Sequence, residues 1–169
     1  MAEFTALVRT LQEQNVRFVL IGVWGANLYA ITAGAVFTTE DRDLFLPPDP
    51  DNLVRAWQAA EAADFTLWCG DEPLDVPRDR FLADAIIARR MLVRAGDEHS
   101  LLVDLTLVMA GFDFETVWNE RRIFVVEGVE VPVARLSHIV QSKAAVGRDK
   151  DRLFLATHAD ALKQLLGRD

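Results

Sequence analysis

The sequence from Thr39 to Leu44 is TEDRDL, and it continues into Phe-Leu before two prolines. We predict a strand over residues 41–46 that ends at the prolines, because proline cannot donate a hydrogen bond to a sheet ladder. Alternate side chains of a strand share a face, so Asp41 and Asp43 point the same way and Arg42 points away from them. Two adjacent carboxylates repel each other unless a cation or a proton lies between them. The triplet is compatible with a cation site, although for so short a motif taken alone a solvated acidic strand end is the better explanation.

A further carboxylate lies within an apolar segment. Residues 101–108 read LLVDLTLV, and Asp104 is the single charge. A charge inside a core strand is costly unless it is paired or bound to a metal. If this strand lies beside residues 41–46, three carboxylates converge, and such a set can bridge two metal ions. The oxygen ligands would suit Mg²⁺. An Asp104 satisfied by an arginine or by backbone groups is the alternative.

Glycines follow the first predicted strand. Residues 17–21 are predicted to be that strand, and residues 26–31 to be a helix, with the sequence GVWG beginning at Gly22 between them. A strand, a glycine turn and a helix offer free backbone N–H groups at a helix N-terminus, which is a site for phosphate. A plain structural turn is the alternative.

Basic residues gather near the end of an otherwise acidic chain. Residues 142–151 read SKAAVGRDKD. Lys143, Arg148 and Lys150 would be able to neutralise a triphosphate. The charge pattern alone is equally consistent with a solvated helix end.

The remaining pattern alternates helices and strands, which predicts an α/β (α+β) fold with a mixed central sheet flanked by helices. We expect one domain over residues 1–169, with a core over about 17–135 and a C-terminal helical segment over about 136–167, broken near Gly147. The other predicted helices are 2–15, 50–63, 81–90 and 114–121. The other predicted strands are 65–69, 91–94 and a hairpin of 123–126 and 129–133, with a loop over 70–80.

Composition excludes several classes of protein. The chain has 169 residues, enough for about one domain, and a formal net charge of −8, which disfavours non-specific binding to nucleic acid. The single cysteine, Cys69, excludes an internal disulfide and a cysteine-built zinc site, and it fits a cytoplasmic location. Residues 18–39 carry no charge and are long enough to span a bilayer. Because glycines interrupt them, we interpret them as a buried strand, turn and helix, and we expect no membrane association.

Taken in order, these features resemble the nucleotidyltransferase superfamily with the DNA polymerase β-like fold. The resemblance covers about residues 17–155 and is nearest to small bacterial members, such as minimal nucleotidyltransferases and nucleotidyltransferase toxins of the AbiEii type. It implies transfer of a nucleoside monophosphate from a nucleoside triphosphate (NTP) to a hydroxyl group, with two Mg²⁺ ions. It assigns metal binding and catalysis to Asp41, Asp43 and Asp104. It assigns nucleotide binding to Gly22, Thr39, Lys143 and Arg148.

Several functions remain open at this point. The acceptor would be a small molecule such as an aminoglycoside or a lincosamide, the 3′ end of a transfer RNA, or a protein side chain. One interpretation places the chain in a toxin–antitoxin pair with a cognate partner protein. Val23 departs from the family, which usually has Gly or Ser there, and valine restricts the approach of the backbone to a phosphate. This departure favours the alternative of a catalytically inactive protein that acts by binding another protein. A metal-dependent phosphohydrolase built on the same carboxylates is a third interpretation.

Overall fold

The computed structural model describes residues 2–39, 41–97 and 101–169. In this part of the chain one mixed sheet has the strand order β4-β3-β5-β6-β2-β1-β8-β7. The strands are β1 (Val19–Ile21), β2 (Arg42–Phe45), β3 (Thr66–Cys69), β4 (Glu72–Pro73), β5 (Val93–Gly96), β6 (Leu102–Thr106), β7 (Arg122–Val126) and β8 (Val129–Val133). The helices are α1 (Ala2–Glu13), α2 (Gly22–Thr32), α3 (Pro50–Ala62), α4 (Arg80–Arg89), α5 (Phe114–Glu120), α6 (Leu136–Val146), α7 (Asp149–Thr157) and α8 (Ala159–Leu166).

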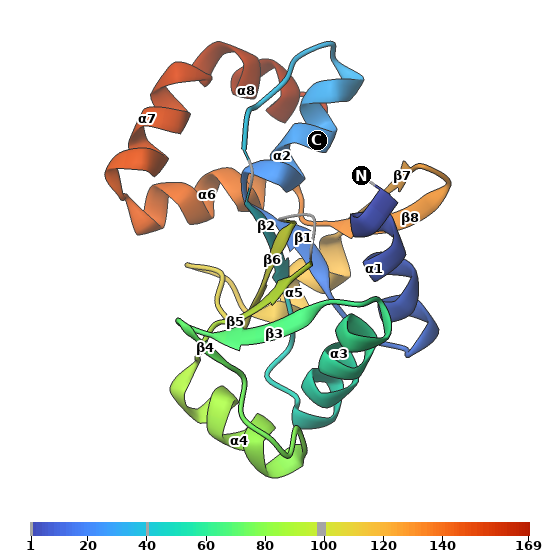
Figure 1. The fold of residues 1–169 in the computed structure, drawn as a ribbon. Coiled ribbons are helices and arrows are strands. Elements are labelled where there is room, and N and C mark those ends of the chain that lie inside the picture. The colour runs from blue at the N-terminus through green and yellow to red at the C-terminus, as the bar shows by residue number, and fades with distance from the viewer. Residues whose placement is uncertain (1, 40, 98–100) are drawn as a thin grey trace.

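The two faces of the sheet bury different sets of side chains. On one face Leu20, Leu44 and Leu105 pack with apolar residues of α1, α3 and α4. On the other face Val19 and Phe45 pack with residues of α5, α6 and α8. This split follows from the two-residue repeat of a strand, which sends neighbouring side chains to opposite faces. Figure 1 shows α6, α7 and α8, in orange to red, gathered with α2 at one end of the molecule, and α3 and α4 at the other.

Helix α2 contributes to both faces. Trp24 and Leu28 belong to the apolar cluster that contains α1, whereas Ala26 and Ala30 belong to the cluster that contains α6. The uncharged stretch over residues 18–39 is therefore occupied by β1 and α2, as the sequence predicted. None of the helices in the described part of the chain has both the length and the apolar character needed to cross a membrane.

The central strands have a register that positions the polar residues. Strand β2 pairs with β1 in antiparallel fashion, with Asp43 opposite Ile21. Strand β2 also pairs with β6, here in parallel, with Asp43 opposite Asp104. Strand β5 pairs antiparallel with β6, with Arg94 opposite Asp104. Arg94, Asp104 and Asp43 thus form one row across three adjacent strands, and residues in such a row share a face.

Most predicted elements are present, with a few corrections. The helix expected over 26–31 begins at Gly22, directly after β1, so no separate glycine turn lies between them. The loop expected over 70–80 contains the short strand β4, and the strand expected from 91 begins at Val93. The predicted hairpin is confirmed, and its two turn residues, Glu127 and Gly128, both have positive φ, as a type I′ turn requires. The C-terminal helical segment breaks at Gly147 as predicted, and again at His158.

Candidate active site

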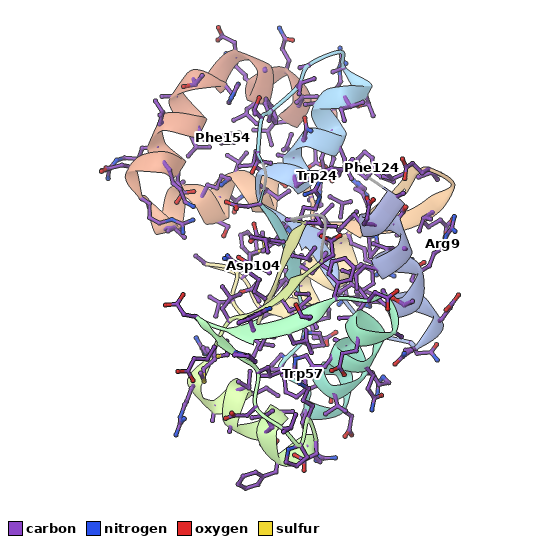
Figure 2. The ribbon with its side chains drawn as sticks, viewed as in Figure 1. Arg9, Trp24, Trp57, Asp104, Phe124 and Phe154 are labelled. Carbon is purple, nitrogen blue, oxygen red and sulfur yellow. The ribbon has the colours of Figure 1, made fainter. Side chains whose placement is uncertain are left out.

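Two carboxylates lie side by side on the central strands. Asp43 on β2 and Asp104 on β6 are direct register partners, so both point from the face of the sheet that α6 covers. Asp41 precedes Asp43 by two residues and is exposed just before β2 begins. Figure 2 labels Asp104 near the centre of the molecule, between the C-terminal helices and the lower part of the sheet. The convergence predicted for the neighbouring strands is therefore confirmed for β2 and β6.

Asp43 occupies an unfavourable position for an anion. Burial, followed by the negative charges of Asp104 and Asp41, raises the pKa of Asp43 from 3.8 to about 6, and the cations of Lys143 and Lys150 counter this only in part. Removal from water and a nearby like charge both disfavour an ionised carboxyl. A bound cation would remove this penalty, so the site is arranged to receive positive charge.

Gly22 allows Asp43 to come close to the start of α2. Its φ is +70°, and a Cβ atom at this position would lie 2.4 Å from Oδ2 of Asp43. Any side chain would therefore be strained and would collide with the carboxylate. No side chain caps the first turn of α2, so its backbone N–H groups begin the helix without a side-chain partner. Val23, the second helical residue, is half-buried and contributes its side chain to a cavity wall.

Arg94 is bonded to the second carboxylate. Its Nε donates to Oδ1 of Asp104 at 2.6 Å, and its Nη2 donates to Oδ2 at 3.0 Å. The side chain of Asp104 is 16% exposed and that of Arg94 is 43% exposed, so the pair lies at the edge of the buried region. An arginine partner for Asp104 was one of the alternatives that the sequence left open, and the structure identifies this partner as Arg94. The one available signal was a basic residue in the strand predicted over 91–94.

The basic residues of the C-terminal helices surround a buried carboxylate. Asp151 on α7 has a side chain that is 1% exposed, and it accepts from Lys143 Nζ at 3.1 Å and from Arg148 Nε at 2.6 Å. Burial alone would raise the pKa of Asp151, but the hydrogen bonds from Arg148 and Lys143 outweigh it and lower the pKa below 3.8. Lys143 Nζ also lies 5.2 Å from the ring centre of Phe154. Asp151 was part of the quoted motif, yet its role in holding both cations was not predicted.

Two adjoining cavities meet at these residues, since both are lined by Asp43, Asp104, Lys143, Arg148 and Asp151. One, of about 340 Å³, has four carboxylates and four cationic side chains in its wall, the further ones being Asp41, Arg94 and Lys150. The other, of about 300 Å³, adds a largely apolar wall made by Ile21, Leu92, Val108, Met109, Ala110, Ile139 and Val146. One site therefore has a charged side and an apolar side.

The structure places every predicted site residue in the wall of these cavities. Gly22 lines the apolar one, and the remaining six line the charged one, namely Thr39, Asp41, Asp43, Asp104, Lys143 and Arg148. The hydroxyl of Thr39 accepts from the N–H of Asp41 at 3.2 Å. Arg42 points to the opposite face as predicted, with its guanidinium 5.1 Å from the ring centre of Trp24. Glu40, which the sequence analysis did not include in the site, lies outside the described residues.

The oxygen ligands at this site meet only some of the requirements of a Mg²⁺ site. Mg²⁺ prefers oxygen ligands and is commonly held by one or two carboxylates. Asp43 and Asp104 are an in-register pair of this kind, and burial together with the neighbouring carboxylates raises the pKa of Asp43. Among the described residues, however, no three His, Cys, Asp or Glu side chains are gathered closely enough to hold a metal ion. Arg94 already engages both oxygens of Asp104.

Comparisons with known proteins identify solved structures with a similar fold. No family model and no curated protein matches the sequence. A solution structure of the antibiotic-resistance factor ANT(2″)-Ia has a TM-score of 0.54 at 14% identity, covering 99% of this chain and 89% of that one. A crystal structure of ANT(2″)-Ia in complex with adenylyl-2″-tobramycin has a TM-score of 0.52 at 14% identity, covering 96% and 92%. The chain shares the fold of ANT(2″)-Ia.

This finding confirms the predicted fold class, a mixed sheet flanked by helices with further helices at the C-terminus. The similarity extends over nearly the whole chain, so it includes the strands that carry the carboxylates and the helices that carry the cations. The closer resemblance to minimal nucleotidyltransferases and AbiEii-type toxins stays a prediction, as does the division into a core and a helical segment.

Proposed function

We propose that the protein is a Mg²⁺-dependent nucleotidyltransferase that moves a nucleoside monophosphate from an NTP to a hydroxyl acceptor. The observation that supports this is the pair of in-register carboxylates, Asp43 and Asp104, on a nucleotidyltransferase fold and between two adjoining cavities. One cavity offers cations for a triphosphate, and the other offers space for a second substrate. A phosphoryl-transfer site needs both, because catalysis there rests on positioning and on charge neutralisation.

Different residues of the site serve the triphosphate and the acceptor. Lys143, Arg148 and Lys150 line the charged cavity and neutralise the triphosphate, aided by the N-terminus of α2 beyond Gly22. Asp43 would hold the metal, with Asp41 on the triphosphate side and Asp104 on the acceptor side. Bound Mg²⁺ would polarise the attacked phosphate and lower the pKa of the acceptor hydroxyl.

Asp104 completes the reaction on the acceptor side. It lines the apolar cavity as well as the charged one, so it is placed to take the proton of the acceptor hydroxyl. The bond from the acceptor oxygen to the α-phosphorus forms while the bond from that phosphorus to the bridging oxygen breaks, and pyrophosphate leaves with the electron pair.

The wall of the apolar cavity favours a small acceptor with an uncharged body. Leu92, Val108 and Val146 are 43–45% exposed at its edge, and Met109 and Ile139 line its interior. Its carboxylates are the pair proposed for metal binding and Asp151, which is already bonded to Lys143 and Arg148. A polycationic aminoglycoside needs carboxylates for its ammonium groups, and this wall offers none beyond those three. We therefore expect tobramycin, the adenylylated compound in the ANT(2″)-Ia complex, to be a poor acceptor here.

A thermal-shift titration tests the proposal. The protein and its Asp43→Asn variant are melted with ATP, CTP, GTP and UTP, each with and without Mg²⁺, since a ligand of the native state raises the melting temperature. We expect a Mg²⁺-dependent rise with at least one NTP that the variant loses. Release of pyrophosphate is then measured with that NTP and a panel of hydroxyl compounds containing tobramycin and lincomycin. The absence of a rise with all four NTPs would contradict the proposal.

One observation favours the second candidate, an inactive protein of the same fold that binds a partner protein, as in a toxin–antitoxin pair. Val23 adds an apolar side chain to the charged cavity at the position where the family has Gly or Ser. If Val23 prevents nucleotide binding, Val23→Gly restores a Mg²⁺-dependent thermal shift that the natural sequence lacks. The third candidate, a phosphohydrolase, would release inorganic phosphate or nucleotide from the NTP without any acceptor.

A further inference from the structure

Arg94 and Asp104 form a closed ion pair inside the proposed metal site. Both carboxylate oxygens of Asp104 accept from one guanidinium, at 2.6 and 3.0 Å. A two-bond pair of this geometry is the strongest ordinary contact between an arginine and a carboxylate. Asp104 is the register partner of both Asp43 and Arg94, so the guanidinium lies in the same row of side chains as the two carboxylates.

Arg94 is also placed to move. Its side chain is 43% exposed, whereas that of Asp104 is 16% exposed, so the arginine is the partner with access to water. Arg94 lines the charged cavity together with Lys143, Arg148 and Lys150, the side chains proposed to bind the triphosphate. It therefore borders both the carboxylates and the space proposed for phosphate, and a rotation of the side chain would exchange one partner for the other.

The charges around this cavity are balanced before any ligand binds. Its wall contains four carboxylates and four cationic side chains, which neutralise one another formally. The formal charge of an NTP with two Mg²⁺ ions is also zero, so binding all of them leaves the net charge of the site unchanged. Binding the triphosphate alone or the metal alone would change that net charge. A divalent cation alone meets Arg94 on Asp104, and a triphosphate alone finds Arg94 held by Asp104 and the carboxylates of Asp41 and Asp43 nearby.

We infer that Arg94 is a positioning residue that couples the two ligands. In the metal-free protein it holds Asp104, and when a divalent cation takes Asp104 the guanidinium transfers to the triphosphate. The metal and the triphosphate then favour the same state of the site, with Asp104 bound to the cation and Arg94 bound to the phosphates. Each ligand therefore raises the affinity of the site for the other by the same factor. This inference rests on the proposed function, because it takes Asp43 and Asp104 as the metal carboxylates.

Binding measurements test the inference without catalysis. Mn²⁺ affinity is measured by electron paramagnetic resonance, first alone and then with tripolyphosphate, which carries the charge of the donor's phosphates without a base. In wild type we expect tripolyphosphate to tighten Mn²⁺ binding about tenfold, within the usual range of coupling between sites. In Arg94→Gln we expect Mn²⁺ alone to bind about tenfold more tightly and the coupling to disappear.

Arg94→Lys separates the exchange from a simple effect of charge. Lysine keeps the positive charge but cannot bond both oxygens of a carboxylate at once. We expect it to bind Mn²⁺ alone more tightly than wild type does and to keep most of the tripolyphosphate affinity. The matched control is Arg80→Gln, which removes an exposed arginine that pairs with Asp51 outside the cavities, and it should match wild type. Circular dichroism checks that each variant is folded.

The outcomes distinguish this inference from the proposed function. If wild type binds neither Mn²⁺ nor tripolyphosphate, the proposed function fails and the coupling fails with it. If wild type binds both but Arg94→Gln has unchanged or weaker Mn²⁺ affinity, Arg94 supports Asp104 rather than competing for it, and only the inference is overturned. Equal Mn²⁺ affinity in Arg94→Lys and wild type would overturn it too, because charge alone would then explain the glutamine variant.

Discussion

The sheet side and the helix side of the site hold similar carboxylates in opposite electrostatic states. Asp43, on the sheet, has a pKa raised to about 6 by burial and by the charges of Asp104 and Asp41. Asp151, on α7, is more deeply buried, and its pKa is lowered by hydrogen bonds from Arg148 and Lys143 that outweigh the burial. Burial raises the pKa of both groups; at Asp43 the neighbouring carboxylates add to this effect, whereas at Asp151 the hydrogen bonds from Arg148 and Lys143 outweigh it.

This difference separates a structural carboxylate from one that lacks a ligand. Asp151 finds its countercharges within the chain, so it fixes Lys143 and Arg148 in place without needing anything else. Asp43 finds a second carboxylate as its register partner instead. A protein retains such an unfavourable arrangement where function uses it, and a bound cation is the simplest compensation.

The largest expected effect follows from removing the charge of Asp43. Asp43→Asn should lower nucleotidyl transfer by about 10³-fold or more, because the metal loses a central ligand. The same variant should be more stable than wild type by about 3 kcal/mol near pH 7 without metal, since an unfavourable buried charge is gone. Activity assays with urea denaturation measure both quantities. Loss of stability together with activity would show that Asp43 serves the fold instead.

Gly22 tests whether the close approach to Asp43 matters. Gly22→Ala should lose at least about 2 kcal/mol of stability and most activity, because it adds both φ strain and a clash at 2.4 Å from Oδ2 of Asp43. Gly34→Ala is a matched control: its φ is +75°, and no heavy atom outside its chain neighbours lies within 4 Å of the added Cβ. It should lose about 1 kcal/mol and keep its activity. Equal losses of stability in the two variants would mean that Asp43 moves aside without cost.

The sequence was sufficient for those parts of the site that depend on local geometry. Asp43 points away from Arg42 because strands alternate every two residues, and the prolines after Leu46 mark where that strand ends. Asp41, predicted to lie in the strand, comes just before β2, yet it lines the same cavity as Asp43. Asp104 was recognisable as a candidate because a charge within the apolar segment LLVDLTLV is costly unless it is paired or bound to a metal. Its convergence with Asp43 was conditional on two strands being neighbours, and the parallel pairing of β2 with β6 met that condition.

The ion pairs depend on long-range geometry that a local pattern does not contain. Arg94 reaches Asp104 because β5 and β6 pair in one particular register, and a shift of one residue would send the arginine to the opposite face. Asp151 meets Lys143 because α6 and α7 fold back on each other at Gly147. The start of α2 was placed too late because glycines usually signal a turn, whereas here Gly22 begins the helix so that Asp43 has room.

The helix side should respond to charge removal in the opposite direction. Asp151→Asn should destabilise the fold by about 2–3 kcal/mol, because it leaves Lys143, whose side chain is 13% exposed, without its buried partner. It should also raise KM for the NTP more than it lowers kcat, because Lys143 and Arg148 lose their fixed positions but keep their charges. Steady-state kinetics and denaturation check this. Asp149→Asn, at a 96% exposed position on the same helix, is the control and should change stability little.

The pH dependence of stability tests the contrast between Asp43 and Asp151 most directly, because the two aspartates should change stability in opposite directions. The raised pKa of Asp43 means that the folded protein binds a proton there that the unfolded chain, at pKa 3.8, releases. The stability of metal-free wild type relative to Asp43→Asn should therefore fall by about 3 kcal/mol as the pH rises from about 4 to about 7. The lowered pKa of Asp151 gives the reverse: the stability of wild type relative to Asp151→Asn is present above about pH 4 and is lost as the pH falls below it. Urea denaturation of the three proteins between pH 3 and pH 7 should give difference curves of opposite slope. Parallel slopes would mean that Asp43 finds a countercharge in solution as effective as the one Asp151 finds within the chain, and the sheet side would then have no electrostatic need for a metal.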